Sequence, residues 1–296
     1  LAYLELRDGG ASHALEAWLD ALSALFAHND LEPALLANLL TPPGEVEWAE
    51  REASVDPARI HALRQQLQRH LAERIGADAL HQCYLALAAE ASLSLDAASQ
   101  ARRRLKQRVL ELLCLADADT AQPLAATQYS SAPGMTDRLG ALTVLLRSDA
   151  AQAPAALAHY RQRYDDNALA LDKWFMAQAQ VPGETALDRV STLQRDASFT
   201  LKNPNRVQSL LGAFVRANPS GFHRADGAGY RFLAGQLVQL DALNPQVAAR
   251  LATAFNGWQR LEPGRREAAR TVIDGLADRD GLSRNLREIV ANVRKQ

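Results

Sequence analysis

Three Asn-Pro pairs lie close together in the second half of the chain, and each is typical of the start of a helix. They are Asn203-Pro204, Asn218-Pro219 and Asn244-Pro245. An asparagine side chain accepts a hydrogen bond from an unpaired N–H of the first helical turn, and proline suits the next position because no N–H is required there. After the first pair, apolar residues recur at helical spacing: Val207, Leu210, Leu211, Phe214 and Val215. These features favour helices over strands.

The same apolar period extends over most of the chain. It predicts helices over residues 12–26, 33–40, 57–75, 77–87, 93–115, 135–146, 159–164, 169–179, 186–193 and 230–243. No stretch alternates with a period of two, so no strand is expected. The fold class predicted is all-α, an irregular two-layer array of short antiparallel helices of the α-solenoid or HEAT-like kind. The stretch Tyr129–Gly134 predicts the clearest break, and residues 1–10 predict a linker or the end of an upstream helix.

The charge balance argues against nucleic acid as a partner. Lys and Arg total 33 against 34 for Asp and Glu, which leaves a net charge of -1, whereas nucleic-acid binders usually carry a basic excess. The run from Arg102 to Lys106 is the exception. It is interpreted as a solvated helix face with one core leucine, and the alternative, contact with DNA or RNA, predicts strongly salt-dependent binding.

Cysteine usage and apolar runs bear on the compartment. Cys83 and Cys114 are too few for a disulfide framework, which predicts a reducing, cytoplasmic location. No apolar run reaches about 18 residues, so no membrane association is expected. The chain begins Leu-Ala-Tyr without an initiator Met or a signal peptide, and we expect a piece of a longer protein.

The chain offers no catalytic motif of its own. None of the seven histidines forms the HExxH pair of a zinc hydrolase. His81 and Cys83 are two residues apart and point to different helix faces, which makes a poor metal pair. Gly227-Ala228-Gly229 lacks the third glycine of a dinucleotide fingerprint and predicts a loop. We expect no metal and no other cofactor in this chain.

Residues Ser198–Leu251 resemble the C-terminal helical domain of bacterial aminopeptidase N, in the zinc HExxH class of metalloproteases. The matching segments are SFT at 198–200, NPNR at 203–206, SLLGAF at 209–214, DGAGYRFL at 226–233 and NPQVAARL at 244–251, with further matches at 135–137, 164–166 and 171–175. The resemblance runs from about Leu31 to the C-terminus. It predicts a linker and first helix over 1–30 and the helical domain over 31–296, or one domain over 1–296.

The resemblance implies a catalytically silent role for this chain. In that family the helical domain closes over the active site and lines a peptide cavity, while zinc and the general base belong to a separate catalytic domain. The expected partners are therefore the protein's own catalytic domain and peptide substrates.

The resemblance also implies the residues that would meet a peptide. Gln246 and Arg250 match a glutamine and an arginine that face the cavity, and the arginine can pair with the downstream part of a peptide. Arg206, Gln208 and Tyr230 are further candidates in the matched motifs. Some members carry a basic residue at the position of Gln208, whereas the neutral glutamine here supplies no charge to hold a carboxylate at that position. From spacing alone, Gln246 and Arg250 could equally be an ordinary boundary pair on one helix flank.

A second hypothesis is a free-standing helical scaffold that binds proteins on a concave surface, as solenoids do. It rests on the all-α pattern and on the missing catalytic groups. It predicts that the chain captures a stable, saturable partner other than a catalytic portion of its own.

Overall fold

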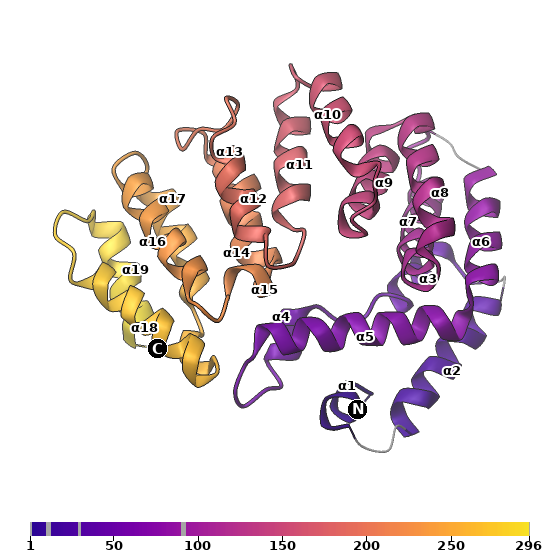
Figure 1. Ribbon diagram of the computed structural model, residues 1–296, viewed down its shortest axis with the longest axis horizontal. Coiled ribbons are helices and arrows are strands. Elements are labelled where there is room, and N and C mark those ends of the chain that lie inside the picture. Colours follow the sequence, from indigo (N-terminus) through magenta and orange to yellow (C-terminus); the bar gives the residue numbers. More distant parts are fainter. Residues whose placement is uncertain (1, 10–12, 29–30, 90–92, 296) are drawn as a thin grey trace. The chain divides into compact units, whose positions relative to one another are not determined.

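The computed structural model describes residues 2–9, 13–28, 31–89 and 93–295 (Figure 1). Within these ranges every regular element is a helix, and the only extended pairing is an isolated parallel bridge between Val55 and Leu261. The all-α prediction is confirmed. None of the helices in these ranges is both long and apolar enough to cross a bilayer.

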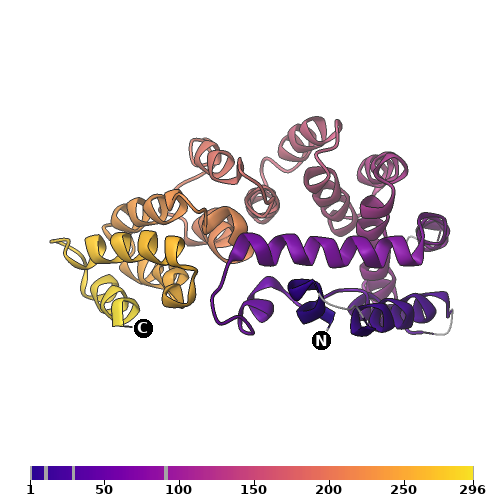
Figure 2. The same cartoon turned by 60° about the horizontal axis from the view of Figure 1, so that its bottom comes forward.

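The chain forms two compact units. The first unit comprises Leu1–Gly44 and Ala62–Gln162, and the second comprises Glu45–His61 and Arg163–Gln296. Helix α5 (Pro57–Ile75) is continuous in Figure 2 and contributes its first turn to the second unit and the remainder to the first. The predicted division at residue 30 stays a prediction.

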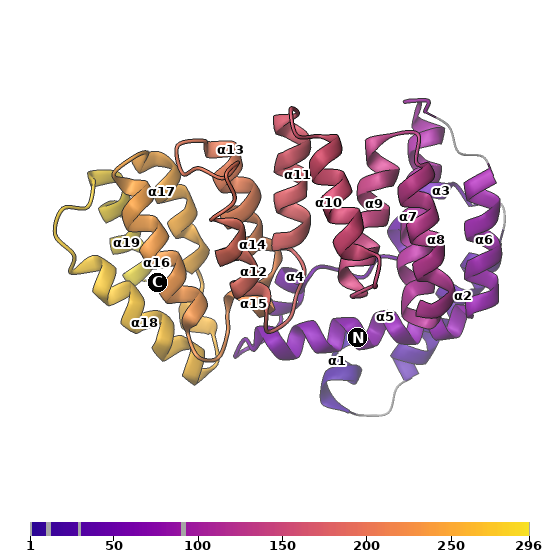
Figure 3. The ribbon, with the colours of Figure 1, turned by 45° about the horizontal axis from the view of Figure 1, so that its top comes forward.

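The helices of the first unit follow one another with short connections. Besides most of α5, they are α1 (Ala2–Asp8), α2 (His13–Ala27), α3 (Pro33–Leu39), α6 (Ala77–Ala89), α7 (Ala97–Ala116), α8 (Ala118–Ser131), α9 (Met135–Arg147) and α10 (Ala153–Arg163). Helix α7 packs against α3, α6, α8 and α9, and it lies beside α6 and α8 in Figure 3. Its apolar face is fully buried through Val109, Leu110, Leu112 and Leu113.

The helices of the second unit are shorter. They are α4 (Glu45–Ala49), α11 (Ala168–Ala179), α12 (Ala186–Leu193), α13 (Pro204–Val207), α14 (Ala213–Ala217), α15 (Pro219–Phe222), α16 (Ala228–Asp241), α17 (Pro245–Ala252), α18 (Pro263–Ala277) and α19 (Arg284–Lys295). A π-helical turn, Gln208–Gly212, joins α13 to α14, and 3-10 turns occupy Thr253–Phe255 and Trp258–Arg260.

The three Asn-Pro pairs begin helices as predicted. The side-chain oxygen of Asn203 accepts from the N–H of Asn205 at 3.0 Å, that of Asn218 from Gly221 at 3.1 Å, and that of Asn244 from Val247 at 3.1 Å. Asn218 is also 2% exposed, and its amide nitrogen donates to the carbonyls of Ala179 and Val181 at the end of α11. This pair therefore caps one helix and fastens it to another.

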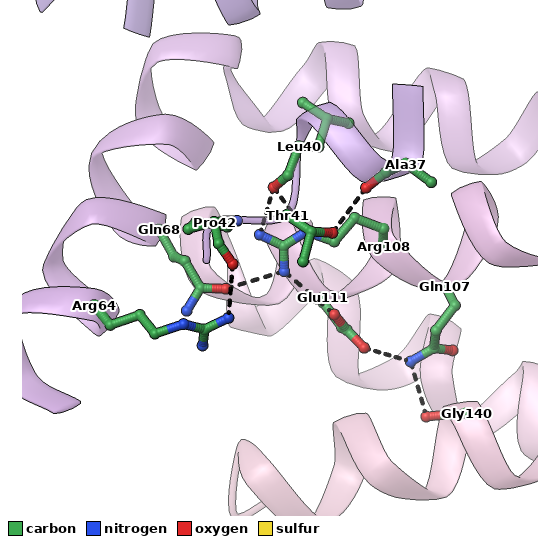
Figure 4. A network of polar contacts seen from close by, with 10 residues as sticks. All are labelled: Ala37, Leu40, Thr41, Pro42, Arg64, Gln68, Gln107, Arg108, Glu111 and Gly140. Carbon is green, nitrogen blue, oxygen red and sulfur yellow. Dashed lines mark hydrogen bonds and ion pairs between the residues drawn. The ribbon is translucent and has the colours of Figure 1, made fainter. Parts of the chain in front are cut away.

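Arg108 ties three helices of the first unit together (Figure 4). Its guanidinium donates twice to the carbonyl of Leu40, at 3.0 and 2.8 Å, and once to Gln68 Oε1 at 3.0 Å. The Leu40 carbonyl ends α3, where helix carbonyls have no partner in the helix. Burial lowers the pKa of Arg108, yet arginine keeps its proton under all ordinary conditions. Arg108 thus caps α3 from α7.

Most of the basic side chains from Arg102 to Lys106 form hydrogen bonds or ion pairs inside the first unit. Lys106 is 5% exposed and pairs with Asp137 at 2.5 Å. Arg102 donates to the Ser99 hydroxyl and Arg103 to the Ser94 carbonyl. The prediction of a solvated face with one core leucine was wrong for Lys106, since Asp137 brings its ammonium into the core. Only Arg104 of the four cations is exposed, which removes the basis for nucleic-acid contact through this run.

Two local predictions were wrong at their ends. Residues Tyr129–Ser131 are the last turn of α8 rather than a loop, because the Ser131 hydroxyl donates to the Thr127 carbonyl within the helix and the chain turns only at Ala132. Helix α7 begins at Ala97 rather than at Leu93, because Asp96 accepts from the Ser99 N–H at 2.8 Å as its cap. Of the two alternatives given for residues 1–10, the structure agrees with a helix, since Ala2–Asp8 form α1.

Candidate functional site

Arg206 is an interior side chain. It is 4% exposed, and its Nε donates to Asp172 Oδ1 at 2.6 Å while Nη1 donates to the Ser198 carbonyl at 2.8 Å. The guanidinium also lies over the Phe175 ring, 4.9 Å from its centroid. The resemblance made Arg206 a candidate for contact with a peptide, but a buried carboxylate of α11 holds its guanidinium in the interior. The burial of Arg206 argues against that predicted contact.

Tyr230 also lies in the interior. It is 1% exposed, and its hydroxyl shares a hydrogen bond with His223 Nδ1 at 3.0 Å. Burial raises its pKa, so the phenol is neutral. Its ring packs edge-on against Phe222, 5.5 Å between centroids, and lies tilted against Phe255, 6.2 Å between centroids. Tyr230 builds the aromatic core of the second unit rather than an exposed surface.

His223 is the titratable group most strongly affected by this core. Burial, together with the positive charge of Arg265, lowers its pKa to about 4. Arg265 donates to the His223 carbonyl at 2.6 Å, and the Phe222 and Tyr230 rings enclose the imidazole. The neutral imidazole is thus the form that this fold accepts.

The stability of the protein is expected to fall as the pH drops from about 6.5 toward 4, because the unfolded state then binds a proton that the folded state resists. Above pH 6.5 the contribution is fully present. The free energy of unfolding lost between pH 7.5 and pH 5 amounts to about 2 kcal/mol. Urea denaturation at both pH values measures it. His223→Gln, which retains a polar group near the Tyr230 hydroxyl, should lose less stability over this interval than the parent protein; an equal loss would assign the effect to other groups.

Gln208 lies in the π-helical turn between α13 and α14 and is half-buried. Its Oε1 accepts a hydrogen bond from Nη1 of Arg216 at 2.7 Å. This contact passes over Gly212, where an added Cβ would lie 2.6 Å from Gln208 Oε1 and 3.0 Å from Arg216 Nη1. Sequence reasoning did not single out Arg216. Its spacing of eight residues from Gln208 does not predict a contact in a regular α-helix.

Gln246 and Arg250 are exposed on one flank of α17. The opposite flank packs between α16 and α19 through Ala248, Leu251 and Ala252. Figures 1 and 3 show α17 and the α13–α14 segment as neighbours in the second unit. Consistent with this, the charge of Arg250 adds to partial burial in lowering the pKa of Arg216. Gln208 and Arg216 are thus in contact on the segment that neighbours α17, the helix that carries Arg250.

No metal site emerges among the residues that the structure describes. In these ranges no three His, Cys, Asp or Glu side chains gather closely enough to hold an ion. Burial raises the pKa of both Cys83 and Cys114, so neither thiol is activated as a nucleophile.

Comparison with known proteins decides the family. Residues 2–295 match the family described as "Domain of unknown function (DUF3458_C) ARM repeats". The chain belongs to this family. ARM repeats are helical arrays, in agreement with the fold described above.

Two curated relatives are aminopeptidases N. The protein of Escherichia coli K12 is 35% identical over 269 residues, which is 91% of this chain and 31% of the relative. That of Caulobacter vibrioides is 34% identical over 279 residues, which is 93% of this chain and 32% of the relative. The chain therefore spans about a third of the length of the relatives it matches, and it is homologous to their C-terminal region, which confirms the resemblance.

A solved structure supports the same relationship. Legionella pneumophila aminopeptidase A, crystallised with aspartic acid, superposes with a TM-score of 0.85 at 27% identity, over 94% of this chain and 33% of that one.

Proposed function

We propose that this chain is the C-terminal helical part of a zinc-dependent aminopeptidase, in which it closes over the active site and lines the cavity that receives the peptide. The observation that carries the proposal is the homology to aminopeptidase N over 91% of the chain. The described residues offer no group that could hold zinc. Zinc would belong to the part of the protein outside this chain, where it polarises the scissile carbonyl.

The exposed flank of α17 supports a binding role for Arg250. Its guanidinium forms no ion pair with any residue that the structure describes, and it stands four residues from the exposed amide of Gln246. An arginine held this way can pair with a carboxylate or donate to a peptide carbonyl. Gln246 and Arg250 are proposed to contact the part of the peptide downstream of the cleaved bond. The chain by itself is proposed to have no peptidase activity.

In the full-length enzyme, Arg250→Ala is expected to raise the KM for a tetrapeptide roughly two- to fivefold, as loss of one exposed charged contact would. The kcat should stay unchanged, because the lost contact is made equally in the ground and transition states. An aminoacyl p-nitroanilide, which has no downstream residues, should be cleaved as before.

Arg266→Ala is the matched control, since Arg266 is an exposed arginine on α18. It should leave the kinetics of both substrates unchanged. An Arg250→Ala enzyme with parental KM for the tetrapeptide would remove the proposed role of α17.

A further inference from the structure

Residues 45–61 leave the first unit and pack with the second, and we call them the inserted segment. The chain departs from the first unit after Gly44 and returns to it at Ala62. The Glu45 carboxylate lies 2.7 Å from His61 Nδ1, so the two ends of the inserted segment are held together. A loop whose ends are already joined loses less conformational entropy when its middle is bound.

The second unit holds the inserted segment by its backbone at residues 260–262. The Val55 N–H donates to the Arg260 carbonyl at 2.7 Å, and the Glu262 N–H donates to the Val55 carbonyl at 2.9 Å. These two hydrogen bonds make the isolated parallel bridge between Val55 and Leu261. Extended peptides dock on an exposed backbone edge by the same kind of pairing.

Two arginines of the second unit add polar contacts to the inserted segment. The Arg260 guanidinium donates to the carbonyls of Ala49 and Glu52, at 2.8 and 3.0 Å. Arg265 Nη1 lies 3.1 Å from Asp56 Oδ1. The inserted segment is acidic, with five carboxylates against two arginines: Glu45, Glu47, Glu50, Glu52 and Asp56 against Arg51 and Arg59. Its charge is therefore opposite to that of the two arginines that hold it.

The attachment is made largely at the surface. Arg260 is exposed and the Asp56 side chain is 40% exposed. Exposed ion pairs add little to stability, and salt screens them further. Trp48 and Val55 are the buried side chains among residues 45–55. A segment with so few buried apolar groups opens at a lower free energy than a helical core does.

We propose that the inserted segment is a releasable latch, which the second unit binds at residues 260–265 and releases while both units stay folded. Helix α5 persists on release because Asp56 caps it locally, accepting from the N–H groups of Ala58 and Arg59 at 3.0 and 3.2 Å. With the segment bound, the chain passes between the units at three places. After release, only the connection between Gln162 and Arg163 joins the second unit to the first. The latch thus controls how freely the second unit moves.

Amide hydrogen exchange of the chain tests the proposal. The N–H groups of Val55 and Glu262 lie on the two sides of the bridge, so release exposes both at once. Both are expected to exchange at least about tenfold faster than the middle of α16, with matching free energies of opening. Raising NaCl from about 0.05 to about 0.5 M should speed both severalfold, since salt screens the attraction between the acidic segment and the arginines.

A double variant weakens the latch without removing a helix cap. Asp56→Asn abolishes the charge that pairs with Arg265 and keeps an oxygen that caps α5. Combined with Arg260→Ala, it is expected to speed exchange of the two bridge N–H groups roughly two- to tenfold, while the middle of α16 stays as protected as in the parent protein. Arg266→Ala, an exposed arginine next to Arg265, is the control and should leave all these rates unchanged.

A disulfide makes the opposite change. Val55→Cys with Leu261→Cys places two thiols at the paired positions of the bridge, where adjacent backbones lie about 4.8 Å apart, within the range that a disulfide spans. Cys83→Ser and Cys114→Ser in the same protein prevent other pairings. After oxidation the Glu262 N–H is expected to exchange as slowly as the middle of α16. After reduction it should exchange at least as fast as in the parent protein.

Three outcomes would overturn the proposal. Bridge N–H groups that exchange no faster than the middle of α16 would mean that the segment opens only when the second unit unfolds. Fast exchange of the Val55 N–H beside a protected Glu262 N–H would indicate fraying of the segment rather than its release. Rates that neither salt nor the double variant changes would refute the role of Arg260 and Arg265.

Discussion

Arg206→Met is expected to lower the free energy of unfolding by about 3–5 kcal/mol, the usual cost of removing one partner of a buried ion pair. Asp172, whose side chain is 13% exposed, would be left without its cation, and the Ser198 carbonyl would lose its donor. Methionine fills much of the volume but offers no hydrogen bond. Urea denaturation of the chain measures the loss.

A control variant and a double variant test this expectation. Arg216→Met removes an exposed arginine and should change the free energy of unfolding by no more than about 0.5 kcal/mol. Arg206→Met combined with Asp172→Leu should be less destabilised than Arg206→Met alone, because no buried charge is then left unpaired. A loss below about 1 kcal/mol for Arg206→Met would mean that water reaches the carboxylate and that the pair is not a structural anchor.

Gly229→Ala is expected to destabilise the second unit by about 4 kcal/mol or more, in the range reserved for severe core defects. A Cβ at this position would overlap the carbonyl oxygen of Phe222 and stand 2.9 Å from its carbonyl carbon. The obstacle is backbone, which cannot swing aside as a side chain can. Helix α16 would have to move away from α15 and open the aromatic core around Tyr230.

Gly235→Ala in the same helix is the matched control. Apart from the neighbouring backbone of the same helix, no atom of the described residues lies within 4 Å of a Cβ built there, so the substitution should stabilise the protein by about 0.5–1 kcal/mol through helix propensity alone. Chemical denaturation of both variants separates the effect of the close approach between α16 and α15 from the effect of helix propensity. Similar effects of the two substitutions would show that α15 yields to α16 without cost.

Much of the fold followed from local chemistry. The Asn-Pro pairs predicted three helix starts, and the apolar period predicted the buried faces of α7, α13–α14 and α16. Caps and apolar stripes act within one or two turns, so the sequence displays them directly. The family resemblance, carried by the motifs in residues 198–251, also holds over almost the whole chain.

The candidate site was less accessible to sequence reasoning, because its contacts join distant residues. The Arg206 partner Asp172 lies 34 residues away, and nothing local distinguishes a buried arginine from an exposed one. Tyr230 fitted a substrate-facing role in the matched motif, yet its hydroxyl is used by His223. Gln208 is neutral, so the sequence indicated no charge at that position to bind a carboxylate. Arg216 contacts Gln208 because of the π-turn between α13 and α14, and no residue pattern predicts that turn.

Photo-crosslinking tests the central claim most directly. A non-hydrolysable tetrapeptide analogue with a benzophenone on its third side chain is bound to the full-length enzyme and irradiated, and the adduct is mapped by mass spectrometry. The account predicts adducts in α17 (Pro245–Ala252) or the α13–α14 segment, abolished by an excess of unlabelled peptide. Adducts confined to residues outside this chain would contradict the proposal that these helices line the peptide cavity.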